Sequence, residues 1–389
     1  MKKKLLFGVG SAAVTIALLA IAMPAQAFTP TLSEVRVLNG PPSDESIDGL
    51  ALTSDAQTAV VVSDRRAWVV DVTSNVATEI TGLTMASRVI MNSAETFAYV
   101  ATGQFKVSKV DVATATVVDT WTDATLGFAV VQMFLSADGL NIYAVGVSGS
   151  FPNIRPGVVK LDLTSGVISK FDAVNLGVPR QAAFNAESGE IFIPYSLSST
   201  TSFAVFDTTS DSFTDIPWAA AGDLTGCDWQ AGTMACLVED TVPYVATVSP
   251  SGAVESSLDV DVAVSNLVDI RVTPDGMRAY VLGDNGGFGA VQAVDLAAMS
   301  SVLVLDTLLE YPEVVALAPD AGQIWFYAYY AEDYNGGYQV LQFAEPKATL
   351  ADTGLDAFQA GVMAVVLCGV GVFLLGLYLA RRRRSANVK

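Results

Sequence analysis

Histidine is absent from the 389 residues of this sequence. A Ser-His-Asp or Cys-His nucleophilic site, a histidine general base and a histidine metal ligand are therefore all excluded. The sequence also has no glycine-rich phosphate loop between a strand and a helix. The chemistry that remains uses carboxylates, and oxygen ligands for cations. We predict no catalytic residue, no metal site and no cofactor, although a structural calcium is compatible with this composition.

Basic side chains are scarce, with 21 lysines and arginines against 40 aspartates and glutamates. Eight of the basic residues lie at the two ends of the chain. Residues 28–353 alone carry 13 basic and 39 acidic side chains, a net charge of −26. Such a segment repels nucleic acid and anionic lipid and attracts cations. We expect no nucleic-acid partner, and a solvated acidic surface on a secreted protein explains the charge.

Cysteine occurs three times. Cys368 lies in an apolar run near the C-terminus, and we interpret it as one more small apolar residue of that run. Cys227 and Cys236 flank a turn, and in an exported protein this pair is a candidate disulfide. Two buried thiols are the alternative, because spacing alone does not give disulfide geometry.

The N-terminus predicts export. Three lysines follow Met1, residues 5–23 are apolar, and Ala25-Gln26-Ala27 is a cleavage site before Phe28. A retained membrane helix is the alternative. Because Pro24 breaks a helix and small residues follow it, we interpret residues 1–27 as a removed signal peptide.

The C-terminus predicts a membrane span. Residues 357–380 are 24 largely apolar residues, and about 20 suffice to cross a bilayer as a helix. The basic tail 381–389 begins with four arginines, which stay cytoplasmic, so the body of the protein lies outside. A short linker, 346–356, precedes the span. It contains the pentapeptide Leu350, Ala351, Asp352, Thr353 and Gly354.

The pentapeptide, the apolar span and the arginine tail follow one another in this order. Together they resemble the sorting signal of sortase-anchored surface proteins of Gram-positive bacteria. Ala351 stands where the common motif has proline, and this form is similar to the one attributed to class E sortases. The resemblance implies that a sortase cuts between Thr353 and Gly354 and joins Thr353 to cell-wall peptidoglycan. An uncleaved single-span membrane protein is the alternative.

The body is periodic. In residues 267–295 an apolar strand leads into a Pro-Asp-Gly turn, a second strand begins near Tyr280, and a third ends in Asp295. With looser copies elsewhere in the chain the unit occurs seven times, and the third strands end at intervals of 40 to 51 residues. A four-stranded propeller blade needs about 40–50 residues. We predict an all-β, seven-bladed β-propeller over residues 28–345, although six and eight blades differ from seven by only one copy. Residues 33–38 are predicted to close the ring as the outer strand of the last blade.

The turns followed by Tyr-Val, at Tyr99-Val100 and Tyr280-Val281, resemble the YVTN-type β-propeller family over residues of about 33 to 343. The resemblance implies this architecture in secreted or surface-displayed proteins, and it implies no ligand.

Carboxylates recur at the ends of third strands, where we expect them to accept hydrogen bonds from turn amides: Asp71, Asp111, Asp162, Asp207 and Asp295. Asp48 and the Glu332–Asp333 pair are scattered carboxylates without the spacing of a calcium loop. Asp259 and Asp261 are two apart on a strand and could share a cation, but a solvated acidic edge also explains them.

Ligand-binding candidates are residues in loops that interrupt the repeat on the face where propellers usually bind. They are Phe151, Arg155, Arg180, Trp218, Tyr330, Asp333 and Tyr334. Aromatic faces beside charged groups suit flat or saccharide-like ligands. Tyr327 and Tyr329 are better explained as strand residues packed between blades.

Three functions fit these features. The first is a non-enzymatic interaction module that is anchored in the cell wall and binds an extracellular ligand or protein. The second is an extracellular hydrolase or lactonase with carboxylates and a cation in the central channel. The third is a structural component that binds neighbouring wall proteins.

Overall fold

The structure is a computed structural model. It describes residues 31–36, 47–83, 85–103, 105–150, 152–197, 200–260, 266–285, 288–330 and 336–343. The chain divides into the units Met1–Glu345 and Pro346–Lys389, and all described residues belong to the first. Among them there is no helix with the length and apolar character needed to cross a membrane. The predicted signal peptide, linker, membrane span and basic tail lie outside the described residues.

All regular elements of the described residues are β-strands, in six antiparallel sheets. The first three sheets are β2 (Ile47–Leu52), β3 (Thr58–Ser63), β4 (Ala67–Asp71) and β5 (Val76–Glu79); β6 (Ala86–Met91), β7 (Phe97–Thr102), β8 (Lys106–Asp111) and β9 (Thr116–Thr122); and β10 (Phe128–Leu135), β11 (Asn141–Ser148), β12 (Arg155–Asp162) and β13 (Ile168–Asp172). The next two are β14 (Val178–Pro179), β15 (Ala183–Asn185), β16 (Glu190–Leu197), β17 (Thr200–Asp207) and β18 (Ser212–Pro217); and β19 (Asp223–Gln230), β20 (Thr233–Glu239), β21 (Tyr244–Val248) and β22 (Val254–Asp259). The sixth contains β23 (Asn266–Val272), β24 (Arg278–Asn285), β25 (Phe288–Asp295), β26 (Ser300–Ala318), β27 (Gln323–Tyr330), β28 (Gly336–Gln342) and β1 (Thr31–Arg36).

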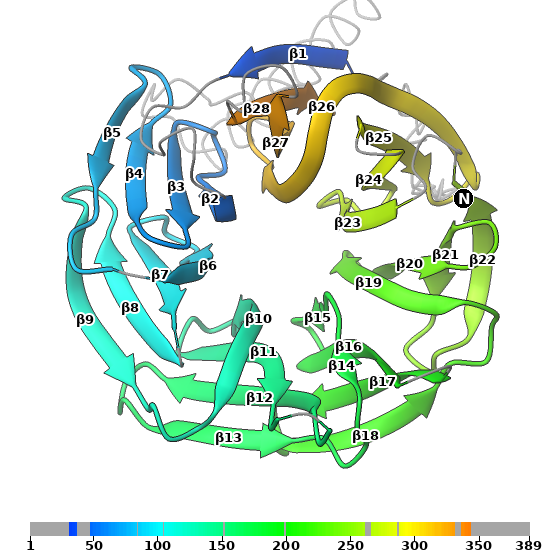
Figure 1. Cartoon of the computed structure of the whole chain (residues 1–389), viewed down its shortest axis with the longest axis horizontal. Coiled ribbons are helices and arrows are strands. Elements are labelled where there is room, and N and C mark those ends of the chain that lie inside the picture. The colour runs from blue at the N-terminus through cyan, green and yellow to red at the C-terminus, as the bar shows by residue number, and fades with distance from the viewer. Residues whose placement is uncertain are drawn as a thin grey trace, which may run out of the picture. The chain divides into compact units, whose positions relative to one another are not determined.

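The sheets stand around a common centre like blades (Figure 1). Strands β2, β6, β10, β19 and β23 face the centre, and β5, β9, β13, β18 and β22 lie on the rim. Each sheet is packed on both faces, so successive residues of a strand enter different cores. On β3, Val61 packs in the cluster that contains Trp325, whereas Val60 and Val62 pack in the cluster that contains Val100. Burial on both faces explains why the second strands are continuous apolar runs rather than alternating ones.

The prediction of seven separate blades is wrong, because the structure has six sheets. The sixth sheet contains the strands of both the sixth and the seventh repeat. Strand β26 pairs with β25 from Ser300 to Glu310 and with β27 from Leu309 to Ala318. The outer strand of one repeat therefore continues into the inner strand of the next without a turn. Residues 302–318 contain Asp306 and Pro312 but no glycine, asparagine or serine, and the pairing with β27 shifts register between Glu310 and Val314.

The predicted ring closure is confirmed, with bounds shifted by two residues. Strand β1 pairs antiparallel with β28, from Thr31 opposite Gln342 to Arg36 opposite Tyr338. Figure 1 shows β1 on the rim beside β28. The N-terminal strand thus covers the edge that β28 would otherwise leave open, and this pairing joins the two ends of the ring.

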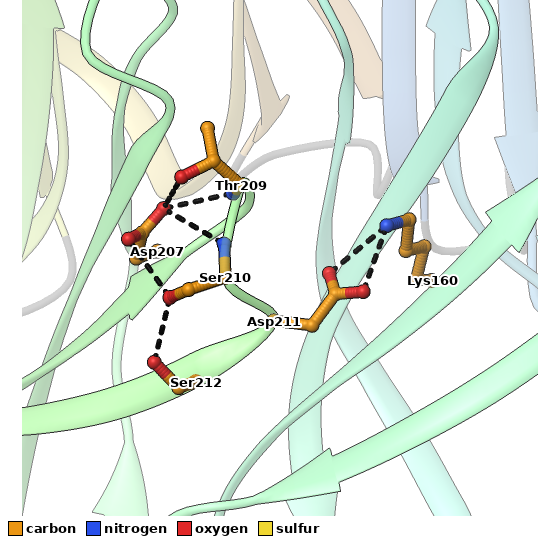
Figure 2. A network of polar contacts seen from close by, with 6 residues as sticks. All are labelled: Lys160, Asp207, Thr209, Ser210, Asp211 and Ser212. Carbon is orange, nitrogen blue, oxygen red and sulfur yellow. Dashed lines mark hydrogen bonds and ion pairs between the residues drawn. The ribbon is translucent and has the colours of Figure 1, made fainter.

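The aspartates that end the third strands accept hydrogen bonds from turn amides, as predicted. Asp207 shows the arrangement in Figure 2: its Oδ1 accepts the Thr209 amide at 2.8 Å and the Thr209 hydroxyl at 2.6 Å. These hydrogen bonds, the Thr209 hydroxyl first, lower the pKa of Asp207 to about 2. Amides also donate to the other four aspartates, Asp71, Asp111, Asp162 and Asp295. These carboxylates therefore serve the fold.

The turn after β17 also joins two blades. Asp211 is in that turn, and both of its carboxylate oxygens lie 2.9 Å from the Lys160 ammonium on β12 (Figure 2). Both side chains are only about one-quarter to one-third exposed (24% and 33%). This ion pair fixes the rim of the fourth sheet against the third.

Candidate functional site: the central channel

A cavity of about 810 Å³ lies at the centre of the ring, between the inner strands. Polar and apolar residues share its lining. The polar side chains come from several inner strands and from the turns and loops next to them. They are Asp48, Ser54, Arg88, Asn92, Glu95, Gln132, Gln181, Asp228, Gln230, Asp269 and Arg271.

A repeated β-bulge positions several of these side chains. The pairing of the first strand with the second shifts register just before Gly49, Arg88, Gln132, Gly226 and Asp269. A bulge bends a strand and redirects the next side chain. Because one backbone feature carries glycine, arginine, glutamine and aspartate in different blades, the fold does not require a particular residue there. The charged residues at this position therefore need an explanation beyond the scaffold.

Arg88 connects three inner strands. Its guanidinium donates to the backbone carbonyls of Val131, of Asp48 at 2.9 Å and of Ser87 at 2.5 Å. Burial lowers the pKa of Arg88, and the nearby carboxylate of Asp48 partly offsets that effect. Burial raises the pKa of Asp48, which Arg88 opposes. The two residues place opposite charges on one side of the channel.

Asp269 and Arg271 form an ion pair on β23. They are two residues apart and therefore share a face of the strand, with Nη2 of Arg271 3.2 Å from Oδ2 of Asp269. The other oxygen of Asp269 accepts the Ile270 amide at 2.8 Å. Burial raises the pKa of Asp269, and Arg271 acts against that shift. Gln181 donates to the Ile270 carbonyl at 3.0 Å and so joins the fourth sheet to this pair.

Asp228 lies on β19, the inner strand beside β23. Its Oδ2 accepts the Val272 amide at 2.7 Å. Removal of the carboxylate from water raises the pKa of Asp228 to about 6, and Arg271 counteracts part of the rise. With Glu95, the channel lining thus contains four carboxylates and two guanidiniums, an arrangement that suits a small polar or charged ligand. Among the described residues no three cysteines, aspartates or glutamates lie close enough together to hold a metal ion.

Of the loop residues predicted to bind a ligand, the three whose side chains the structure describes do not line this cavity. Arg155 begins β12, Arg180 is exposed after β14, and neither lines the channel cavity. Trp218 packs edge-on against Phe203 at 6.0 Å and belongs to a blade core. Phe151, Asp333 and Tyr334 lie outside the described residues. Tyr330 is the last residue of β27, and only its backbone is described.

The sorting pentapeptide, Leu350 to Gly354, also lies outside the described residues. In contrast, Cys227 on β19 and Cys236 on β20 are directly opposite each other and joined by a disulfide, with their Cα atoms 4.1 Å apart. Of the two alternatives that the sequence left open, the structure has the disulfide.

Five charged residues of the channel lining were not predicted: Arg88, Glu95, Asp228, Asp269 and Arg271. The sequence contains a signal for all of them except Glu95. When the repeats are aligned on the turn after the first strand, these four residues lie two or four positions before that turn. Asp48 was noted, but only as one scattered carboxylate.

Comparisons with known proteins agree on architecture. No family model and no curated protein matches the chain. Among solved structures 1509 chains match. One is the crystal structure of the Myceliophteria thermophila Cps50 (Swd1) beta-propeller domain, with a TM-score of 0.62 and 10% sequence identity, covering 81% of this chain and 99% of that chain. The fold is a β-propeller. At such low identity the likeness shows the fold alone, and the resemblance to the YVTN-type family stays a prediction.

Proposed function

We propose that this protein is a non-enzymatic interaction module, displayed at the cell surface, that binds its ligand at the central channel. The observation that supports a binding role is the set of charged side chains on the channel wall. Burial of a charge costs free energy, and the repeated bulge places glycine as readily as arginine at the same position. Binding of a polar ligand explains why these charges are present, whereas the fold does not require them.

The location forms part of the proposal. The signal peptide 1–27 directs export, and the sorting signal around Thr353 leads to attachment to peptidoglycan by a sortase. Ten residues separate Phe343, just past β28, from Thr353, and they span at most about 35 Å when extended. The ring is therefore held close to the wall and suited to partners in its immediate surroundings.

Mass spectrometry of the C-terminus of the native protein tests the anchoring. We expect a mature end at Thr353 carrying wall material, and Thr353→Ala should leave the full-length chain in the membrane fraction. Asp352→Ala, at the variable position of the pentapeptide, is the matched control and should still be processed. An intact Arg381–Lys389 tail on the native protein would contradict attachment by sortase.

A hydrolase or lactonase is the second candidate, because Asp228 and Asp269 lie in one cavity and burial raises the pKa of both. Shifted carboxylates in a cavity are typical of catalytic sites. Metal analysis of the purified protein separates the two functions. One equivalent of calcium that is lost in Asp228→Asn favours the enzyme, whereas a protein without bound metal favours the interaction module.

A further inference from the structure

A second cavity, of about 320 Å³, opens beside the channel where β10, β15 and β19 end. The two cavities share Phe134, Asp228 and Gln230 in their walls, so they are adjacent. A volume of this size suits a ligand of a few heavy atoms or the end of a longer side chain. We refer to this second cavity as the side pocket.

Aromatic rings form much of the side-pocket wall. Phe134 and Phe184 are both partly exposed, with ring centroids 5.4 Å apart. The indole of Trp229 is also partly exposed, and it stacks on the buried ring of Phe192 at 5.8 Å with an interplanar angle of 5°. This stacking fixes the orientation of the indole, so the pocket has a preformed aromatic surface.

The charged groups of the side pocket are all carboxylates. Among the described residues, Asp228 and Glu187 line it, and no lysine or arginine does. The guanidinium that acts on Asp228 is that of Arg271 on β23, which pairs with Asp269 at 3.2 Å. Because Asp269 offsets the charge of Arg271, the charge of Asp228 is not fully neutralised by its own neighbours. The groups that face Asp228 are therefore Arg271 and Asp269 from β23 and, across the pocket, Glu187 from the turn after β15.

We propose that the side pocket binds an organic cation, an alkylammonium or alkylguanidinium group, with its charge at Asp228 and its apolar part against Trp229, Phe134 and Phe184. Cations are attracted to the faces of aromatic rings, most strongly to tryptophan. The strongly acidic segment 28–353 also concentrates cations around the ring. The inference deepens the proposed interaction function, on which it rests, by naming the ligand class and the part of the site that selects it.

Calorimetric titration of the purified protein with n-butylguanidinium tests this site, with n-butylurea as the neutral control of the same shape. We expect saturable binding of the cation at pH 7.5 and at least tenfold weaker binding of the urea. Asp228→Asn should weaken binding at least tenfold, and its amide oxygen still accepts the Val272 N–H. Lowering the pH to 5 should weaken binding several-fold, because Asp228 becomes protonated.

Three further variants sharpen the test. Glu187→Gln changes only an exposed turn residue, and we expect severalfold weaker binding in a protein with unchanged melting temperature. Asp259→Asn, an exposed carboxylate on β22 far from the pocket lining, is the matched control and should bind as the wild type does. Trp229→Phe should abolish any change of tryptophan fluorescence on titration.

Absence of butylguanidinium binding at millimolar concentration would overturn the proposal, as would equal affinity for the urea or for Asp228→Asn. Such a failure is distinguishable from failure of the proposed function. The C-terminal mass spectrum reports on anchoring whatever the pocket binds, and an intact C-terminal tail would leave the cation titration unaffected.

Discussion

Five of the six charged side chains that line the channel have an opposite charge nearby. Arg88 lies by Asp48, and Arg271 lies between Asp269 and Asp228. Burial still disfavours the ionised forms, as the raised pKa values of the aspartates show. A cluster of this kind contributes little to stability by itself, because desolvation offsets much of the attraction between the charges. Its retention in the channel is therefore better explained by binding than by folding.

Replacement of Asp228 with asparagine should stabilise the protein, and more so at high pH. The pKa of Asp228 is about 6 in the folded protein, above its ordinary value of 3.8. The folded state consequently binds the proton more tightly than the unfolded state, and stability falls as pH rises from about 4 through 6. The gain in unfolding free energy should be larger at pH 8 than at pH 4.5 by on the order of 2 kcal/mol.

Urea denaturation at the two pH values measures this difference. Asp259→Asn, on the exposed end of β22, is the control and should show no such pH dependence. A gain for Asp228→Asn that is equal at both pH values would mean that Asp228 ionises as freely in the folded protein as in the unfolded chain.

The hairpin of β19 and β20 combines a site residue with a covalent link. Cys227 immediately precedes Asp228, and its disulfide to Cys236 holds the inner strand of this sheet to the second strand. Gly226, on the other side of Cys227, leaves room for Gln181: an added Cβ would lie 2.7 Å from the amide oxygen of that side chain. The repeat is weakest in sequence here, and the disulfide compensates in part for the lost pattern.

The double variant Cys227→Ala/Cys236→Ala should lose about 2–3 kcal/mol of unfolding free energy, the value expected for a short closed loop. Reduction of the wild type with dithiothreitol should produce a similar loss, and the reduced double variant should show no further change. Urea denaturation with and without reductant measures both. Equal stability of wild type and variant under oxidising conditions would contradict a stabilising role.

The strands and their turns were predictable because each depends on local chemistry, and the closing strand was predictable because the last repeat has no outer strand of its own. Asp207 ends a third strand and its hydrogen bonds lie within the next three residues. The merger of the last two repeats through β26 was not predictable, since it depends on pairing with β25 and β27 on opposite halves of one strand. The channel charges were hidden for a related reason: residues from β6 and β23 are about 180 positions apart in sequence, and only the closed ring brings them to one cavity.

The whole ring depends on contact between its two ends. Strand β1 supplies the outermost strand of the sixth sheet, which also contains the last strand, β28. Without β1, the edge of β28 would be exposed to solvent and free to pair with other chains. The closing strand therefore contributes both stability and protection from aggregation.

Deletion of residues 28–39 should lower the melting temperature sharply and promote association of the protein. Differential scanning calorimetry and light scattering measure the two effects. A synthetic peptide of residues 28–39, added in excess, should restore much of the melting temperature because it can occupy the edge of β28. A deletion variant with an unchanged melting curve would show that the closure does not support the ring.

The pairing of Thr31 with Gln342 also dictates an order of events during synthesis. The strand that leaves the ribosome first must wait for the partner that leaves last, so the ring closes only after some 300 further residues have emerged. Contacts between such distant residues form slowly. Early sheets can assemble with their neighbours during this interval, while β1 stays unpaired. The sixth sheet can therefore be completed only in a chain that still contains both β1 and β28.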